Sequence, residues 1–159
     1  MSKFIFNFIF LIFFSFSVHS EEIEILLDKP GNGLKIQNHY KVNVNYRGML
    51  ENGIEFDSSF KRNESFTFQI GIRKVILGWE KGLLGMKVGG KRTIKIPPSL
   101  AYGSNGAGDL IPPNSTLIFE IEILDATPPL YEKLLASDLE NKKKDGFIFI
   151  DIRSSDDIK

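Results

Sequence analysis

The spacing of apolar residues is the feature that most constrains the fold of this 159-residue chain. Four segments place apolar side chains at every second position, which is typical of half-buried β-strands, and they cover residues 41–46, 66–70, 92–96 and 117–124. Residues 75–86 differ, because their apolar side chains recur every three or four positions, at Ile76, Trp79, Leu83 and Met86. The pattern predicts an α+β fold, an antiparallel sheet with one short helix packed on it.

Turn signals divide these segments. Residues 23–27 predict an edge strand, and Asn52-Gly53 predicts a type I′ turn across which residues 49–50 and 54–56 pair. The polar stretch 57–65 predicts a bulge or loop. Residues 102–113 form a long loop rich in Gly and Pro, and loops of that length are usually functional.

The N-terminal segment differs from the rest in composition. Seven of the fourteen phenylalanines precede residue 17, Lys3 supplies an early positive charge, and Val18-His19-Ser20 resembles a cleavage site. A membrane anchor is the alternative, but the apolar run is shorter than the roughly 20 residues that span a bilayer. We therefore expect residues 1–20 to be a removed signal peptide, leaving no membrane attachment and placing the protein in the endoplasmic reticulum lumen or outside the cell.

The remaining chain predicts a domain at 21–125 and a tail at 126–159, joined through Thr127-Pro128-Pro129. Tyr131, Leu134, Leu135 and Leu139 could lie on one amphipathic helix of the tail. The residues that follow resemble a degenerate EF-hand remnant, in which Lys143 replaces a carboxylate ligand and Ile152 replaces the bidentate glutamate. We expect no metal site there.

Composition excludes several classes of function. Twenty basic and twenty acidic residues give zero net charge, which predicts no nucleic-acid partner. The absence of cysteine and the presence of only two histidines, His19 and His39, predict no metal site. Residues 85–92 approach a phosphate loop, but Arg92 stands where such a loop needs Ser or Thr, so a glycine turn fits better.

Seven aromatic residues coincide with irregular segments or sheet ends. Each is individually a normal core residue, but together they predict a concave pocket for a small apolar ligand. They are Tyr46, Phe56, Phe66, Phe68, Trp79, Tyr102 and Phe119. Asp57, Arg62 and the hydroxyls of Tyr46 and Tyr102 would supply its polar groups.

A family resemblance rests on motifs that occur in order along residues 21–125. The motifs are Asn45-Tyr46-Arg47-Gly48 with Asn52-Gly53, Phe56-Asp57-Ser58-Ser59, Val75-Ile76-Leu77-Gly78-Trp79, Ile96-Pro97-Pro98, Ala101-Tyr102-Gly103, Ile111-Pro112-Pro113 and Thr116-Leu117-Ile118-Phe119. Through them the chain resembles the FKBP family of peptidyl-prolyl cis-trans isomerases, in its secretory branch. The resemblance implies a bent sheet wrapped around the short helix, with the ligand pocket between them. Residues 107–109 depart from the family, whose best-known members carry a histidine and a proline there.

The resemblance also implies a role for each matching residue. Trp79 would form the pocket floor, Val75 and Ile76 its rim, and the Ile76 backbone would bond an extended ligand. The implied catalytic residues are Tyr46, Phe56, Asp57, Trp79, Tyr102 and Phe119. The implied residues for binding substrate or macrolide are Arg62, Phe66, Phe68, Val75, Ile76, Leu110 and Ile111.

The implied activity is X-Pro rotation in folding polypeptides, without a cofactor, by a monomer that also binds tacrolimus and rapamycin. A binding module that keeps the fold without turnover is the alternative. Two N-x-[ST] sequons, at Asn63 and Asn114, are glycosylation candidates if the chain is exported.

Overall fold

The computed structural model describes residues 22–144, so the predicted signal peptide and the end of the tail lie outside the described residues. Within this range six strands form one antiparallel sheet. The strands are β1 (Glu24–Lys29), β2 (Lys41–Leu50), β3 (Glu55–Ser58), β4 (Phe66–Gln69), β5 (Lys91–Ile96) and β6 (Leu117–Thr127). The helices are α1 (Ser59–Arg62), α2 (Leu77–Gly82) and α3 (Leu130–Lys144), with 3₁₀ turns at Pro98–Leu100 and Gly103–Asn105. The predicted α+β class is confirmed.

The sheet has the order β1-β5-β6-β2-β3, so the last strand within residues 22–144 lies near the middle. β2 pairs along its whole length with β6. Its other edge is shared, because β4 pairs with residues 41–44 and β3 with residues 47–49. β1 is an edge strand, as predicted.

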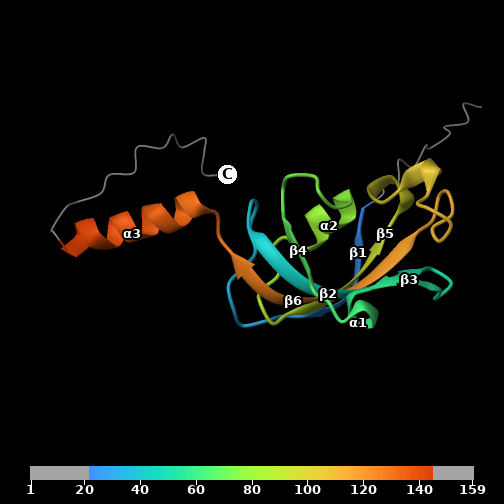
Figure 1. Ribbon diagram of the computed structural model, residues 1–159, viewed down its shortest axis with the longest axis horizontal. Coiled ribbons are helices and arrows are strands. Elements are labelled where there is room, and N and C mark those ends of the chain that lie inside the picture. The colour runs from blue at the N-terminus through green and yellow to red at the C-terminus, as the bar shows by residue number, and fades with distance from the viewer. Residues whose placement is uncertain (1–21, 145–159) are drawn as a thin grey trace, which may run out of the picture.

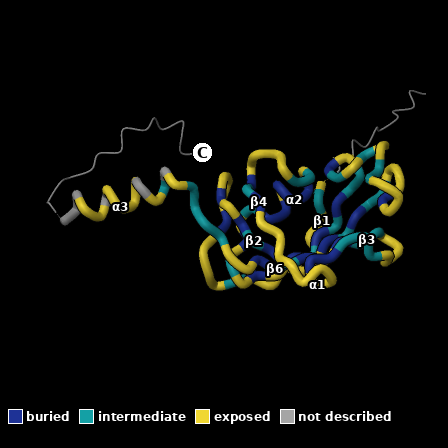
Figure 2. Tube along the Cα trace, viewed as in Figure 1, coloured by how far each residue is buried: buried dark blue, intermediate teal, exposed yellow. Residues whose placement is uncertain are grey.

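One face of this sheet carries α2 (Figure 1). Side chains alternate between buried and less buried along β2 and β6, so the period-two spacing places their apolar side chains against the helix (Figure 2). Gly78 allows a close approach, since a Cβ at this position would lie 2.4 Å from the Ile96 side chain on β5.

Helix α2 is shorter than the predicted span of 75–86. The chain leaves the helix at Leu83 and turns, with the Met86 N–H donating to the Leu83 carbonyl at 3.2 Å and Gly85 at φ +79°. Leu83 and Met86 are nevertheless buried. The spacing of apolar residues thus predicted which side chains are buried, but not where the helix ends, because the buried positions continue into a non-helical turn.

The pairing of β2 with β3 is confirmed, but the type I′ turn is wrong. A type I′ turn needs positive φ at both central residues, and of this pair only Gly53 has it, at +85°. The Gly53 N–H donates to the Leu50 carbonyl at 2.9 Å, and the Leu50 N–H donates to the Ile54 carbonyl at 2.8 Å. The connection is therefore a three-residue loop that ends in a left-handed glycine.

The stretch 57–65 is not simply a loop, because it contains the end of β3 and helix α1. Ser58 caps α1, accepting a hydrogen bond from the Lys61 N–H at 3.4 Å, and Asn63 ends it in the left-handed region. The chain has to cross here from the β3 half of the β2 edge to the β4 half. One helical turn makes that crossing.

The tail helix predicted after Pro129 is present as α3, and Figure 1 shows it extending away from the end of β6. The Glu132 N–H donates to the Pro129 carbonyl at 3.1 Å, so the first turn begins directly after the two prolines. Within residues 22–144, no helix combines the length and the apolar character that crossing a bilayer would require.

Candidate active site

A cavity of about 200 Å³ lies between α2 and the sheet. Aromatic and apolar side chains dominate its lining, which consists of Tyr46, Phe56, Asp57, Phe66, Lys74, Val75, Ile76, Trp79, Tyr102 and Phe119. We call Tyr46, Trp79 and Phe119 the floor, and Lys74, Val75, Ile76 and Tyr102 the rim. The structure therefore brings most of the predicted site residues to one place.

The floor is a set of interlocked rings from three elements. Trp79 of α2 is 3% exposed and meets the other two floor rings edge to face. Its ring centroid lies 5.1 Å from that of Tyr46 of β2, at an angle of 83° between the planes, and 5.2 Å from that of Phe119 of β6, at 87°. Such pairs add about 0.5–1.5 kcal/mol each beyond the burial of area. Helix and sheet are thus held together by the same residues that shape the cavity.

The Trp79 ring N–H is buried and has no hydrogen-bond partner in residues 22–144. A buried donor without an acceptor usually costs free energy, and the ring faces packed against this indole can compensate only weakly. Because the nitrogen is covered, it is not available to a ligand. Trp79 therefore offers only the carbon atoms of its ring to a ligand bound above it.

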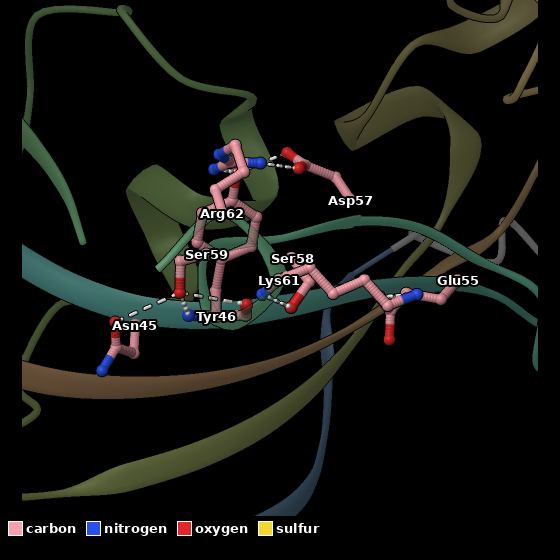
Figure 3. Close-up of polar contacts among 8 residues, drawn as sticks. All are labelled: Asn45, Tyr46, Glu55, Asp57, Ser58, Ser59, Lys61 and Arg62. Atoms are coloured by element: carbon pink, nitrogen blue, oxygen red, sulfur yellow. Dashed lines mark hydrogen bonds and ion pairs between the residues drawn. The ribbon is translucent and has the colours of Figure 1, made fainter. Parts of the chain in front are cut away.

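Three polar side chains form a cluster at one wall of the cavity (Figure 3). The Tyr46 hydroxyl donates to Asp57 Oδ2, and Arg62 donates from Nη1 to Asp57 Oδ1 and from Nη2 to the Tyr46 hydroxyl, the latter at 2.9 Å. The guanidinium carbon of Arg62 also lies 5.6 Å from the Tyr46 ring centroid. Both oxygens of Asp57 are therefore engaged, and its charge is matched by Arg62.

The two cavity phenols titrate above their ordinary range. Burial, followed by the hydrogen bond to Asp57, raises the pKa of Tyr46, and burial, followed by the charge of Asp57, raises that of Tyr102. The hydrogen bond to Tyr46 is the main cause that raises the pKa of Arg62. Both phenols are neutral hydrogen-bond donors at physiological pH.

Ser59 fixes the strand that carries Tyr46. Its hydroxyl is buried, accepts a hydrogen bond from the Tyr46 N–H at 2.8 Å, and lies 3.2 Å from Asn45 Oδ1 (Figure 3). The first residue of α1 therefore satisfies a backbone donor that the β2–β3 and β2–β4 pairings leave between them. The Ser59 hydroxyl thus holds the β2 backbone at Tyr46, at the point where the pairing of β2 changes from β3 to β4.

Gly48 makes room for two aromatic rings. A Cβ at this position would lie 2.7 Å from the Phe56 ring and 2.8 Å from the Phe119 ring. Those rings meet at 5.6 Å and 82° across the glycine. Phe56 reaches the cavity because β2 has no side chain there.

The rim next to α2 is held by a buried carboxylate. Glu80 accepts hydrogen bonds from the Gly71 N–H at 2.5 Å and the Arg73 N–H at 2.8 Å, and Arg73 has a left-handed φ of +57°. The Ile76 carbonyl, just before α2, accepts hydrogen bonds from the backbone N–H groups of Trp79, at 2.9 Å, and Glu80, at 3.2 Å. Within residues 22–144 the Ile76 N–H makes no backbone hydrogen bond.

Four predicted binding residues do not line the cavity. Arg62 acts behind Tyr46 and Asp57, and Phe68 is buried behind Phe66, stacked on it at 5.3 Å. Leu110 is 63% exposed, and Ile111 is 6% exposed. The loop folds back through two backbone hydrogen bonds between Ala107 and Ile111, which turn Ile111 into the core. The overhanging loop contributes Tyr102 to the cavity.

Sequence reasoning gave no role to Lys74, Gly48, Ser59 and Glu80, although Gly48 and Ser59 stand in the motifs quoted above. Lys74 stands beside the predicted rim residues, and its position in the sequence was the available signal. The other three act through a close approach or a buried hydrogen bond, neither of which leaves a periodic pattern.

The two predicted glycosylation sites, Asn63 and Asn114, are both exposed, in left-handed turns. In the described part of the chain, no three His, Asp or Glu side chains are grouped as metal ligands.

Comparison with known proteins places this cavity in a family. Residues 33–124 match the family described as FKBP-type peptidyl-prolyl cis-trans isomerase. The chain is 56% identical over 85 residues to FK506-binding protein 2 of Candida glabrata, covering 53% of this chain and 62% of that protein. It is 48% identical over 96 residues to an FK506-binding protein of Neisseria meningitidis serogroup B, covering 60% of this chain and 88% of that one.

Two solved structures are similar in fold. FkpA from Escherichia coli superimposes with a TM-score of 0.59 at 43% identity, over 67% of this chain and 47% of FkpA. AtFKBP13 gives a TM-score of 0.59 at 40% identity, over 66% of this chain and 91% of that chain.

Proposed function

The chain belongs to the family of FKBP-type peptidyl-prolyl cis-trans isomerases, so its FKBP domain is a rotamase domain, and we propose that the protein rotates X-Pro bonds of polypeptides bound over Trp79. The observation that carries this proposal is the combination of an apolar ring floor with hydrogen-bond donors at its rim. The chain spans 62% of the first of these relatives, so substrates and partners of the whole protein are part of the proposal.

Rotation of an amide breaks no bond and needs no nucleophile. Its barrier of about 18–20 kcal/mol comes from the loss of amide resonance. The twisted amide has less charge separation than the planar one. Moving the amide from water to an apolar floor therefore costs less free energy for the twisted form than for the planar form. This difference in binding free energy lowers the barrier to rotation.

Two rim donors can assist this rotation. The Tyr102 hydroxyl and the Ile76 N–H can bond carbonyls of an extended peptide on either side of the proline. Asp57 has both oxygens engaged by Tyr46 and Arg62, so it orients Tyr46 and is not placed as a general base. Phe56 and Phe66 close the remaining walls around the proline ring.

The same cavity is proposed to bind macrolides of the tacrolimus and rapamycin type. Two relatives carry FK506 binding in their names, and the floor and rim residues described above provide the matching apolar surface. Macrolide and peptide would compete, because both would occupy the space above Trp79.

Catalysis is tested by isomerisation of a proline tetrapeptide in a protease-coupled assay. We expect activity that a macrolide inhibits, and Phe56→Ala should lower kcat/KM about tenfold or more through loss of aromatic contact with the proline. Phe60→Ala is the matched control, since Phe60 is exposed on α1 and does not line the cavity. Macrolide binding without any turnover would instead identify a binding module.

We further propose that the protein acts in the secretory pathway, in the endoplasmic reticulum lumen or outside the cell. The apolar N-terminal segment with its small-residue boundary at Ser20 supports this. Expression in a secretory host should yield a mature chain that starts at Glu21. A Phe10→Asp variant should be retained uncleaved, and an unprocessed parent chain would refute the proposal.

A further inference from the structure

The mouth of the cavity carries an unbalanced positive charge. The two charged residues in the cavity lining are Asp57 and Lys74. Asp57 is paired with Arg62, so the Asp57 wall is locally neutral. Lys74 is exposed, and within residues 22–144 it forms no ion pair. Its ammonium group is the net charge that an approaching peptide meets.

The backbone that carries Lys74 is fixed in place. Glu80 holds the N–H groups of Gly71 and Arg73, and the carbonyl of Ile76 begins α2. Arg73 adds a second exposed cation directly before Lys74. The flexible lysine stem extends from this anchored loop, so the charge stays at the rim while the ammonium can follow a ligand.

The opposite side of the mouth does not cancel this charge. Asp109 is the one acidic residue in the loop of residues 102–113, and it is exposed and absent from the cavity lining. Tyr102, which is the residue of that loop that lines the cavity, is a phenol and carries no charge at physiological pH. A peptide bound across the mouth is thus exposed to positive charge on the Lys74 side.

We propose that Lys74 is a specificity-determining residue that makes the enzyme prefer prolines flanked by acidic residues. The inference rests on the proposed isomerase function and adds the substrate class. A carboxylate that passes within about 6–8 Å of the ammonium in a solvated site should gain roughly two- to fivefold in kcat/KM over a neutral residue. Salt should weaken the preference, because exposed charges are screened over about 8 Å at physiological ionic strength.

The test uses the intact protein and peptides of the form Ac-Xaa-Leu-Pro-Phe-Xaa-NH₂ with Glu, Gln or Lys at both variable positions. Rates are measured by NMR exchange, so no coupling protease adds its own charge preference. We expect the order Glu, Gln, Lys in kcat/KM, with the Glu-to-Lys ratio falling toward one in 1 M NaCl. Lys74→Gln should lower the ratio at low salt, leaving only the weaker effect of Arg73, and Lys74→Glu should lower it further.

Lys81→Glu is the control, because Lys81 is exposed on α2, lies outside the cavity lining and changes the net charge equally. A ratio that Lys74→Glu leaves unchanged, or that Lys81→Glu changes as much, overturns the assignment of Lys74. Failure to isomerise even the Gln peptide overturns the proposed function itself. Turnover of the Gln peptide with equal Glu and Lys rates overturns the inference alone.

Discussion

The floor and the rim of the cavity are built in different ways. The floor comes from the regular elements β2, α2 and β6, whose rings pack edge to face and are almost fully buried. The rim comes from two loops, one tied to α2 by Glu80 and the other folded on itself between Ala107 and Ile111. The floor is therefore part of the core of the domain, whereas the rim can vary without unfolding it.

Among single substitutions, Trp79→Ala should show the largest difference between floor and rim. Removing a buried indole should lower the free energy of unfolding by about 3–5 kcal/mol and abolish measurable isomerisation. Urea unfolding followed by circular dichroism gives the first quantity and NMR exchange the second. A variant with unchanged stability would show that the floor is not part of the core.

Glu80→Ala should act on the rim and spare the floor. Two backbone N–H groups lose their acceptor, at a cost of about 1–2 kcal/mol in stability, and the loop that carries Lys74 loosens. Hydrogen exchange should accelerate at Gly71 and Arg73, and kcat/KM should fall. Glu64→Ala, at an exposed glutamate outside the cavity lining, should change neither quantity.

Tyr102→Phe should separate catalysis from stability. Its side chain is 40% exposed, and no hydrogen bond within residues 22–144 contributes to its pKa shift, so unfolding should be unaffected. If the hydroxyl bonds the peptide, kcat/KM falls about two- to twelvefold, the equivalent of a net hydrogen bond of 0.5–1.5 kcal/mol. An unchanged kcat/KM would assign Tyr102 to shape alone.

The smallest effect concerns pH. The folded-state pKa values of Tyr46 and Tyr102 are raised, so their contribution to stability is complete below the unfolded value of about 10 and is lost as pH rises through the folded values. Unfolding midpoints should be insensitive to these groups from pH 7 to 9 and fall above about pH 10. The double variant Tyr46→Phe, Tyr102→Phe should show a shallower alkaline decline, and an equal decline would contradict the shifts.

The same contrast explains what the sequence could predict. Val42, Val44 and Tyr46 alternate because a sheet has two faces, and Trp79 keeps helical spacing because α2 packs one side on that sheet, so the burial of these residues was predictable. The placement of Trp79 at the floor of a cavity came from the family resemblance. The turn of Ile111 into the core and the exposure of Leu110 could not be predicted, because both depend on a backbone bridge from Ala107. Their part in ligand binding stays a prediction. Ser59 and Glu80 were missed because one buried hydroxyl or carboxylate that serves a distant N–H leaves no period to detect.

The place of β6 in the sheet has a consequence for synthesis of the chain. β6 is the last strand of the domain, yet it lies between β5 and β2 and contributes Phe119 to the floor. Until residue 127 has left the ribosome, β2 and β5 each present an open edge to other chains. A nascent chain that stops short of β6 thus exposes two unpaired strand edges, and folding has to wait for contacts between residues about 80 positions apart, such as Val44 and Ile123.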